Sequence, residues 1–403
     1  MHPDEAHEAR SGTRRITGVV FALLFLVAIA TPALVAFLDP EHFAEARKSV
    51  LEEKRKPVSF PDAPTDLGES LQQWPRAFET WWNDAFGLRT ALIRWHNIVR
   101  LFGFGVTPGP SVLLGHDEQG SPWMFVSIES TVDDFRGMKP FSEKELKWWK
   151  AFLEQRRDWL AANGCRYLFV VAPNKSSIYP EYMPPELTVV EPRTRLDQLV
   201  AYMDEHSTVP VLDLRPALRT AKTRAFAPVP DGSRLYFPLG THWNSYGAWV
   251  GQREIMRTIG DWFPRMWPTP LSLYKITSIV GQGDTWASRF HMDDVLSQAF
   301  PVLNYLGPPK VTTQGEQAGV AVYESSEGGP VCVLLRDSFS TQLGPHLAPH
   351  FSKLALAWNQ TQGPDFTITL MKKAKPDLVI EQVVERYLSG TLPTMLPETP
   401  RFR

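Results

Sequence analysis

Short apolar segments alternate with stretches of helical periodicity between residues 142 and 380, and this alternation constrains the fold more than any other feature. The strand-like segments are 166–172, 209–214, 331–335, 353–358 and 377–380, and the helix-like segments are 142–162, 194–205 and 245–259. Strands that are apolar along their whole length are typical of a parallel sheet covered by helices on both faces. We therefore predict an α/β fold with one main domain over residues 71–395.

Composition excludes several classes of protein. The chain has 42 Lys+Arg against 44 Asp+Glu, a balance unlike that of a nucleic-acid-binding protein, which usually carries a basic stripe. Its two cysteines, Cys165 and Cys332, exclude a disulfide scaffold and a Cys-rich zinc module. Both lie in or beside predicted strands, which favours buried free thiols over a disulfide between them.

An uncharged apolar run of 23 residues, Ile16–Leu38, is long enough to cross a membrane as a helix. We expect an uncleaved transmembrane anchor, with residues 1–15 as a cytoplasmic tail and the main domain outside the cytoplasm. A cleaved signal peptide is the alternative. Residues 39–70 are charged and contain proline, which indicates a juxtamembrane spacer.

Apolar and aromatic residues recur at helical spacing between Leu71 and Phe102. This periodicity predicts one or two helices, broken near Gly87. We expect them to pack onto the domain that follows, so the tryptophans of this segment are interpreted as a packing face.

Three polar loops lie where a parallel sheet binds its ligands. Residues 173–177 and 336–340 each follow a predicted strand, and residues 240–244 precede a predicted helix. In open α/β sheets, ligands bind at the carboxyl ends of the strands. These loops are therefore the candidate site.

Two residues of these loops, Ser338 and His242, suit nucleophilic catalysis. A serine at a strand-to-helix turn is exposed at the edge of the sheet, where amide groups of the helix N-terminus stabilise a developing oxyanion. A neutral histidine is the general base that such a serine needs. The alternative is that Ser338 caps a helix and His242 is an ordinary loop histidine.

Several motifs in sequence order extend this interpretation. They are FETWWNDAFGLRTALIRWHN at 78–97, GHD at 115–117 followed by WMF at 123–125, APNKSSIYPEYMP at 172–184, THWNSYGA at 241–248, LRDSFS at 335–340 and PDLVIEQVVERYL at 376–388. Together they resemble the AlgJ/AlgX group of SGNH-hydrolase-like proteins, the alginate and related exopolysaccharide O-acetyltransferases. The resemblance covers residues 70 to 388 and implies an SGNH-hydrolase-like parallel sheet flanked by helices.

The resemblance implies roles for individual residues. Ser338 matches the nucleophile and His242 the base, but the acid of the family lies two residues before the histidine, where this chain has Gly240. Either another carboxylate orients His242, with Asp337 and Asp231 as candidates, or the site works as a dyad, or activity is lost.

Other residues of the matching motifs are candidates for lining the site. Asn174 is a candidate oxyanion donor and Lys175 a candidate contact to an acidic glycan, although both residues also suit a purely structural role in the loop. Tyr179, Trp243 and Arg336 are candidates for site lining or glycan contact, with core packing as the alternative for Trp243.

The resemblance also implies a function. It predicts an O-acetyltransferase anchored in the inner membrane, with its main domain in the periplasm, that acetylates an alginate-like exopolysaccharide. A membrane-bound O-acyltransferase is the implied partner and acetyl donor, and neither a cofactor nor a metal is expected. His346 and His350 are spaced four apart, but prolines interrupt that stretch, so we do not interpret them as metal ligands. An acetyl-polysaccharide esterase and a non-catalytic glycan-binding scaffold of an export complex are the alternatives.

Overall fold

A computed structural model describes residues 19–27, 30–31, 58–62, 70–85, 89–223, 234–358, 363–390, 392–397 and 399–402. The chain divides into two compact units. The first takes in the described residues up to Pro108 together with Ala287–Val295, and the second takes in Gly109–Trp286 and the described residues from Leu296 onward. The candidate loops all belong to the second unit, so that unit is the one that positions the site.

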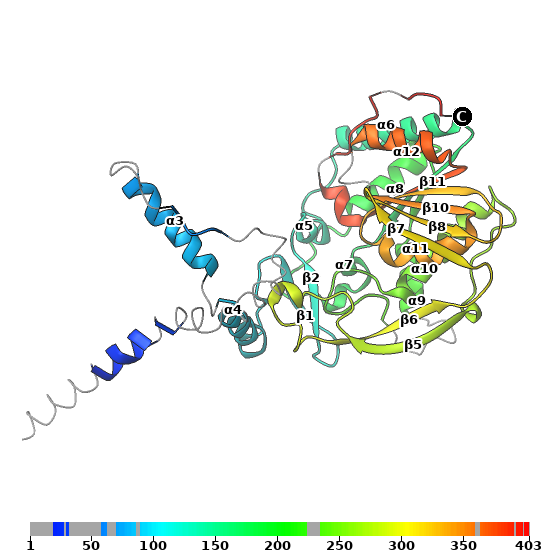
Figure 1. Cartoon of the computed structure of the whole chain (residues 1–403). Helices are drawn as coiled ribbons and strands as arrows, with labels where there is room; N and C mark the ends of the chain where they lie inside the picture. Colours follow the sequence, from blue (N-terminus) through cyan, green and yellow to red (C-terminus); the bar gives the residue numbers. More distant parts are fainter. Residues whose placement is uncertain are drawn as a thin grey trace, which may run out of the picture. The chain divides into compact units, whose positions relative to one another are not determined.

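A seven-stranded sheet forms the centre of the second unit (Figure 1). Its strands, in spatial order, are β4 (Val211–Asp213), β3 (Arg166–Ala172), β11 (Leu378–Val384), β9 (Val331–Arg336), β10 (Lys353–Trp358), β8 (Val320–Ser325) and β7 (Val311–Gln317). The first five strands are parallel and confirm the five predicted strands. Two further strands were not predicted and make the sheet mixed, because β8 pairs antiparallel with β10 and β7 antiparallel with β8.

Helices cover both faces of this sheet, as the apolar strands predict. Alternate residues of each strand point to opposite faces, so Val170 and Leu334 belong to one hydrophobic core while Val171 and Val333 belong to the other. The first core is covered by α7 (Lys175–Ile178), α9 (Arg215–Thr223), α10 (Ser245–Gly260) and α11 (Ser340–Leu347). The second core is covered by α6 (Glu143–Ala161), α8 (Arg195–His206) and α12 (Pro364–Ala374).

The three helices predicted at 142–162, 194–205 and 245–259 are confirmed as α6, α8 and α10. Ser142 caps α6 and forms a capping box with Glu145, as the spacing of these two residues predicts. The short helix α5 (Thr131–Arg136) and 3-10 turns at Pro180–Tyr182, Leu271–Leu273 and Ala348–His350 were not predicted, whereas the 3-10 turn Glu385–Ser389 follows β11 at the end of the closing motif 376–388.

Two antiparallel hairpins were also missed by the sequence pattern. One pairs β1 (Val112–His116) with β2 (Pro122–Val126), and the other pairs β5 (Tyr274–Gly281) with β6 (Gln298–Tyr305). Half of β5 is exposed, so its sequence lacks the continuous apolar run that marks the central strands. The second hairpin matters for the site, because its connection carries a carboxylate described below.

The first unit contains α3 (Ser70–Ala85), α4 (Arg89–Ile98) and a π-helical segment (Val99–Gly103). The expectation of two helices broken near Gly87 is thus confirmed, although Gly87 itself lies outside the described residues. A 3-10 turn at Ser288–Phe290 belongs to the same unit, and Asn97 donates to the carbonyl of Phe290 at 2.8 Å. Packing of these helices onto the main domain stays a prediction.

The apolar run Ile16–Leu38 is only partly described: residues 19–27 and 30–31 are helical, and the rest lie outside the described residues. Among the helices that are described, none is both long and apolar enough to cross a membrane. The anchor therefore stays a prediction.

Both cysteines, Cys165 and Cys332, are buried free thiols. This agrees with the favoured interpretation and leaves no disulfide between them.

Candidate active site

Ser338 and His242 meet at the carboxyl edge of the central sheet. Ser338 follows β9 and precedes α11, and its carbonyl accepts a hydrogen bond from Thr341 N–H at 3.1 Å. His242 Nε2 lies 2.7 Å from Ser338 Oγ. This distance is within the range for a nucleophile and its general base. The structure thus brings together the two residues that the motifs single out, although they lie 96 positions apart in the chain.

A third group, Asp284, completes the arrangement from an unpredicted position. His242 Nδ1 lies 2.9 Å from Asp284 Oδ2, and the same oxygen accepts the backbone N–H groups of Thr241 at 2.7 Å and His242 at 2.8 Å. Burial opposes the charge of this carboxylate, but the hydrogen bonds and charge of His242 outweigh it and lower the pKa of Asp284 to about 2. Asp284 therefore stands as an ionised carboxylate against the imidazole, the geometry of a Ser-His-Asp triad.

Gly240 explains how the acid comes from elsewhere in the chain. A Cβ atom at residue 240 would lie 2.1 Å from the carbonyl oxygen of Asp284 and 2.3 Å from its Oδ2. The space that a side chain at position 240 would enter is thus filled by Asp284. A carboxylate at the position used by the resembling family and the Asp284 carboxylate are mutually exclusive, and this chain has the second.

The segment that carries Asp284 is fixed by hydrogen bonds from both sides. Gln298, buried at the start of β6, donates to the carbonyls of Gln282 at 2.7 Å and Asp284 at 2.8 Å, and accepts the N–H of Leu239 at 2.8 Å. Trp286 N–H donates to the carbonyl of Leu239 at 3.0 Å. One glutamine therefore ties the acid-bearing loop to the loop that leads to His242.

Substitution Gly240→Ala tests this steric relation. The new Cβ would overlap the main chain of Asp284, so the acid-bearing segment must move away from His242 Nδ1. We expect kcat to fall by at least about 10²-fold, as for other displacements of a catalytic group by about 1 Å. The matched control is Gly281→Ala in β5, whose Cβ would meet nothing within 4 Å. Equal activity of the two variants in a steady-state ester assay would contradict the role of Gly240.

Asp337 was a candidate for the orienting acid, and the structure corrects this expectation. Its Oδ1 accepts the N–H of Phe339 at 2.8 Å and its Oδ2 accepts the N–H of Val384 at 2.5 Å. These bonds shape the nucleophile turn and tie it to β11, while the imidazole contacts Asp284 instead. Asp231, the other candidate, lies outside the described residues.

Trp243, Tyr179 and Arg336 are placed in the protein interior, not on an open site surface. Trp243 is fully buried and donates from Nε1 to the carbonyl of Phe339 at 2.9 Å. Tyr179 is buried with its hydroxyl accepting the N–H of Leu235 at 3.0 Å. The guanidinium of Arg336 lies 3.9 Å from the ring centroid of Trp358. For Trp243, the alternative of core packing is the one that the structure shows, and its bond to Phe339 supports the residue next to Ser338.

Lys175 is likewise buried, and the expected glycan contact is replaced by contacts within the protein. Its Nζ donates to the carbonyls of Phe237 at 3.0 Å, Pro238 at 2.9 Å and Gly240 at 2.6 Å. Three carbonyls use all three donors of an ammonium group. Burial lowers the pKa of Lys175 to about 7, while the charge of Asp284 acts in the opposite direction. Lys175 therefore holds the loop that precedes His242.

Substitution Lys175→Met tests this structural role. The variant keeps the apolar stem but leaves buried carbonyls without their donor, and each unsatisfied group costs about 1–3 kcal/mol. We expect the free energy of unfolding in urea to fall by at least that amount. Lys222→Met is the control, because Lys222 also donates to a carbonyl, that of Ile178, but from a more exposed position. If the free energy of unfolding falls no more in Lys175→Met than in Lys222→Met, Lys175 does not hold the loop that precedes His242.

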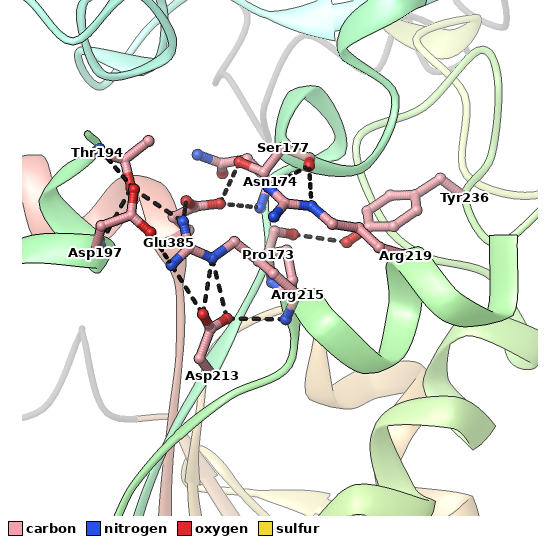
Figure 2. Close-up of polar contacts among 10 residues, drawn as sticks. All are labelled: Pro173, Asn174, Ser177, Thr194, Asp197, Asp213, Arg215, Arg219, Tyr236 and Glu385. Atoms are coloured by element: carbon pink, nitrogen blue, oxygen red, sulfur yellow. Dashed lines mark hydrogen bonds and ion pairs between the residues drawn. The ribbon is translucent and has the colours of Figure 1, made fainter. Parts of the chain in front are cut away.

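Asn174 lies in a network that fixes the turn after β3. Glu385 Oε2 accepts the N–H of Asn174 at 2.9 Å and the hydroxyl of Ser177 at 2.5 Å. Figure 2 shows Glu385 beside Arg215, which also pairs with Asp213 and Asp197. Burial raises the pKa of Glu385 to about 7, against the opposing effect of Arg215. The backbone of Asn174 is thus held in place, and the role of its side chain as an oxyanion donor stays a prediction.

Asp284 is the functional candidate that sequence reasoning missed. The signal available was indirect: Gly240 stands where the motif requires an acid, so a carboxylate from another segment had to be sought. Asp284 lies just after β5, at the start of the connection 282–297 between two strands that the pattern did not predict. No spacing rule links it to His242.

Comparisons with known proteins agree with the motifs. Residues 112–272 match the family model described as the SGNH hydrolase-like domain of acetyltransferase AlgX. The chain is 26% identical over 201 residues to a probable alginate O-acetylase AlgJ from Pseudomonas fluorescens, a match that covers 48% of this chain. The chain spans only 44% of that relative's length.

Solved structures with similarity to this chain include PatB1 from Bacillus cereus with a sulfonyl adduct. That protein is 14% identical with TM-score 0.49, and the match covers 69% of this chain and 98% of PatB1. The O-acetyltransferase domain of Pseudomonas putida AlgJ is 18% identical, with TM-score 0.45 and coverage of 70% and 94%. AlgX from Pseudomonas aeruginosa is 15% identical, with TM-score 0.44 and coverage of 70% and 64%.

The family match and the AlgJ relative confirm the resemblance that the motifs carry. The chain is AlgJ/AlgX-like, with a mixed α/β domain of the SGNH-hydrolase-like type.

Proposed function

We propose that this protein is an extracytoplasmic O-acetyltransferase that moves an acetyl group to hydroxyls of an alginate-like exopolysaccharide through an acetyl-Ser338 intermediate. One observation carries the proposal: the continuous contact from Ser338 Oγ through both nitrogens of His242 to Asp284, at 2.7 and 2.9 Å. Such a chain activates a serine as nucleophile. The name of the AlgJ relative supplies the substrate class.

In the first half-reaction, Ser338 Oγ attacks the acetyl carbonyl carbon while His242 Nε2 accepts the hydroxyl proton. His242 Nδ1–H donates to Asp284, whose charge stabilises the imidazolium without taking the proton. The tetrahedral intermediate then expels the donor's oxygen, which receives the proton from Nε2. The product is acetyl-Ser338 and the deacetylated donor.

The second half-reaction reverses these roles with a different alcohol. A sugar hydroxyl attacks the acetyl carbon and gives its proton to His242 Nε2, and Ser338 Oγ leaves and takes that proton. The acetyl ester is thereby transferred, and the enzyme returns to its starting state. Side chains of His242 and Asp284 are 21% and 29% exposed, so the site is open enough for a polymer hydroxyl to approach.

The proposed setting follows from the N-terminal sequence and the family. An anchor formed by residues 16–38 would hold the domain at the outer face of the inner membrane, near a membrane-bound O-acyltransferase that supplies acetyl groups. Acetyl-CoA is not available outside the cytoplasm, so the donor is expected to be a membrane partner.

The alternatives are separated by what attacks the acetyl-enzyme. The same site hydrolyses acetyl esters if water replaces the sugar hydroxyl, which is the esterase alternative. The scaffold alternative rested on Gly240, because a site without an acid is a poor catalyst. Asp284 supplies that acid and removes the observation that favoured a non-catalytic protein.

The test uses the full chain with a chromogenic acetyl ester as donor, with and without non-acetylated alginate oligosaccharides. We expect an acetyl adduct on the peptide that contains Ser338, and faster release of chromophore with the acetyl group recovered on the oligosaccharide. Recovery of free acetate alone, whatever the oligosaccharide, would favour the esterase. No adduct and no ester cleavage would refute both enzymatic functions.

A further inference from the structure

The end of strand β11 lies between the turns that follow β3 and β9. In the sheet, β11 pairs on one side with β3, which leads to the turn 173–177, and on the other side with β9, which leads to Ser338. Neighbouring strands lie about 5 Å apart, so residues at the end of β11 can contact both turns. Two consecutive residues there, Val384 and Glu385, make these contacts.

Val384 holds the nucleophile turn, residues 337–339, through its main chain. Its N–H donates to Asp337 Oδ2 at 2.5 Å, and Asp337 Oδ1 accepts the N–H of Phe339 at 2.8 Å. Ser338 therefore stands in the chain between two residues that one buried carboxylate ties to the end of β11. Because Val384 takes part with its main chain, no rotamer change on the β11 side can break this link.

Glu385, the next residue, holds the turn 173–177 through its side chain. Its Oε2 accepts the N–H of Asn174 at 2.9 Å and the hydroxyl of Ser177 at 2.5 Å, as Figure 2 shows. The side chain is fully buried, and its other oxygen lies 3.6 Å from Nη1 of Arg215. The carboxylate is thus fixed by the arginine on one side and fixes the turn on the other.

The turn 173–177 in its turn holds the loop that carries the base. Lys175 follows Asn174 directly, and its buried ammonium donates to the carbonyls of residues 237, 238 and 240. We call residues 237–242 the base loop, because it ends at His242. A displacement of Asn174 would therefore displace the base loop as well.

A carboxylate at position 385 is costly, because burial opposes its charge. An apolar side chain of similar size would fill the same space without that cost. What such a side chain lacks is an acceptor for the two donors of the turn 173–177. Since Val384 already holds the nucleophile turn, the carboxylate at 385 lets two consecutive residues fix both turns at once.

We propose that Glu385 is a positioning residue for the reaction of Ser338 with His242. Through the turn 173–177 it keeps the base loop in register with the nucleophile turn. The contact of 2.7 Å between Ser338 Oγ and His242 Nε2 depends on that register, and a shift of about 1 Å in a catalytic group costs about 10²-fold in rate. The inference rests on the proposed function, because it concerns how the same triad is assembled.

The test compares two substitutions that separate the reach of Glu385 from its charge. Glu385→Gln keeps the length of the side chain and an oxygen that accepts from Asn174, but it loses the charge that faces Arg215. Glu385→Asp keeps the charge but is one methylene shorter, so its oxygens fall short of the turn. The control is Asp197→Asn, which removes the charge of another partner of Arg215 outside the turn 173–177.

Hydrogen exchange of the full chain, followed by mass spectrometry, measures the link without any enzymatic activity. In Glu385→Asp, the amides of the base loop should exchange at least about 10-fold faster than in the wild type, because the turn that clamps them has lost its anchor. Amides of α12, on the other face of the sheet, should exchange as in the wild type, and Asp197→Asn should change neither segment. Unchanged exchange in the base loop, or equal acceleration of α12, overturns the proposal.

Cleavage of a chromogenic acetyl ester measures the consequence for the triad. We expect kcat per folded enzyme to fall by about 10²-fold in Glu385→Asp and by about 3-fold to 10-fold in Glu385→Gln, while KM for the ester stays within about twofold of the wild type. Urea unfolding gives the folded fraction of each variant. A larger loss in Glu385→Gln than in Glu385→Asp would show that charge matters and not reach, and would overturn the proposal. If Glu385→Asp does not fold, a kcat of Glu385→Gln equal to that of Asp197→Asn overturns it.

The two measurements separate this inference from the proposed function. If the wild type cleaves no acetyl ester, the proposed function fails, while the exchange of the base loop still decides whether Glu385 holds it. If the wild type is active and Glu385→Asp leaves both the exchange and kcat unchanged, the inference fails and the proposed function stands.

Discussion

Replacing Ser338 by alanine is expected to remove the acetyl-enzyme and to lower kcat for ester cleavage and transfer by at least about 10⁴-fold. The hydroxyl lies 2.7 Å from His242 Nε2 and is the atom that forms the covalent bond. In serine enzymes, loss of the nucleophile costs about as much as loss of the whole triad. The measurement is steady-state cleavage of a chromogenic acetyl ester, with mass analysis of the peptide that contains residue 338.

The control for this variant is Ser278→Ala, because Ser278 is an exposed serine on β5. It should retain the activity and the acetyl adduct of the wild type. If the Ser338 variant still forms an acetyl adduct elsewhere at the wild-type rate, another residue is the nucleophile and the proposed function falls.

Replacing Asp284 by asparagine is expected to lower kcat by about 10⁴-fold with little change in fold. Asparagine keeps the shape and one acceptor oxygen, so the N–H groups of Thr241 and His242 retain a partner. It loses the charge that stabilises the imidazolium and permits the wrong tautomer of His242, the same defect that the equivalent change causes in known serine proteases. The control is Asp261→Asn, at an exposed carboxylate just after α10.

The pH dependence of this loss of kcat in Asp284→Asn follows from the pKa of Asp284. The folded-state value of about 2 lies below the ordinary value of 3.8, so the folded site favours the carboxylate. Its stabilising contribution is present above about pH 4 and is lost as the pH falls through about 2. The deficit of the asparagine variant should therefore persist at every pH above about 4. An asparagine variant with wild-type kcat at neutral pH would show that Asp284 is not the orienting acid.

The central sheet was predictable because its signals are local. Continuous apolar runs such as residues 166–172 and 353–358 occur where a strand is buried on both faces. The two residues of the capping box of α6, Ser142 and Glu145, lie only three positions apart. The antiparallel strands β7 and β8 have exposed and half-buried positions, so their sequences lack that signature. The mixed character of the sheet was therefore missed.

The nucleophile and base were predictable because each stands in a short motif beside a strand or helix end. The acid could not be predicted, because only the tertiary fold brings it to the histidine. Asp284 lies 42 positions from His242, in a loop that Gln298 fixes. The choice between site lining and structural packing was left open by the sequence for a similar reason. Lys175, Tyr179 and Trp243 carry polar atoms that suit a site, but each finds its partner inside the protein.

The central claim is that Asp284 takes the place of the acid missing at Gly240. Detecting the hydrogen bond from His242 Nδ1 to Asp284 tests it most directly. In the full chain with ¹⁵N-labelled histidine, proton NMR should show a low-field Nδ1–H resonance of His242 that is retained in Asp337→Asn and lost in Asp284→Ala. A resonance that survives in Asp284→Ala and disappears only in Asp337→Asn would contradict the account and would return the role of orienting acid to the residue beside the nucleophile.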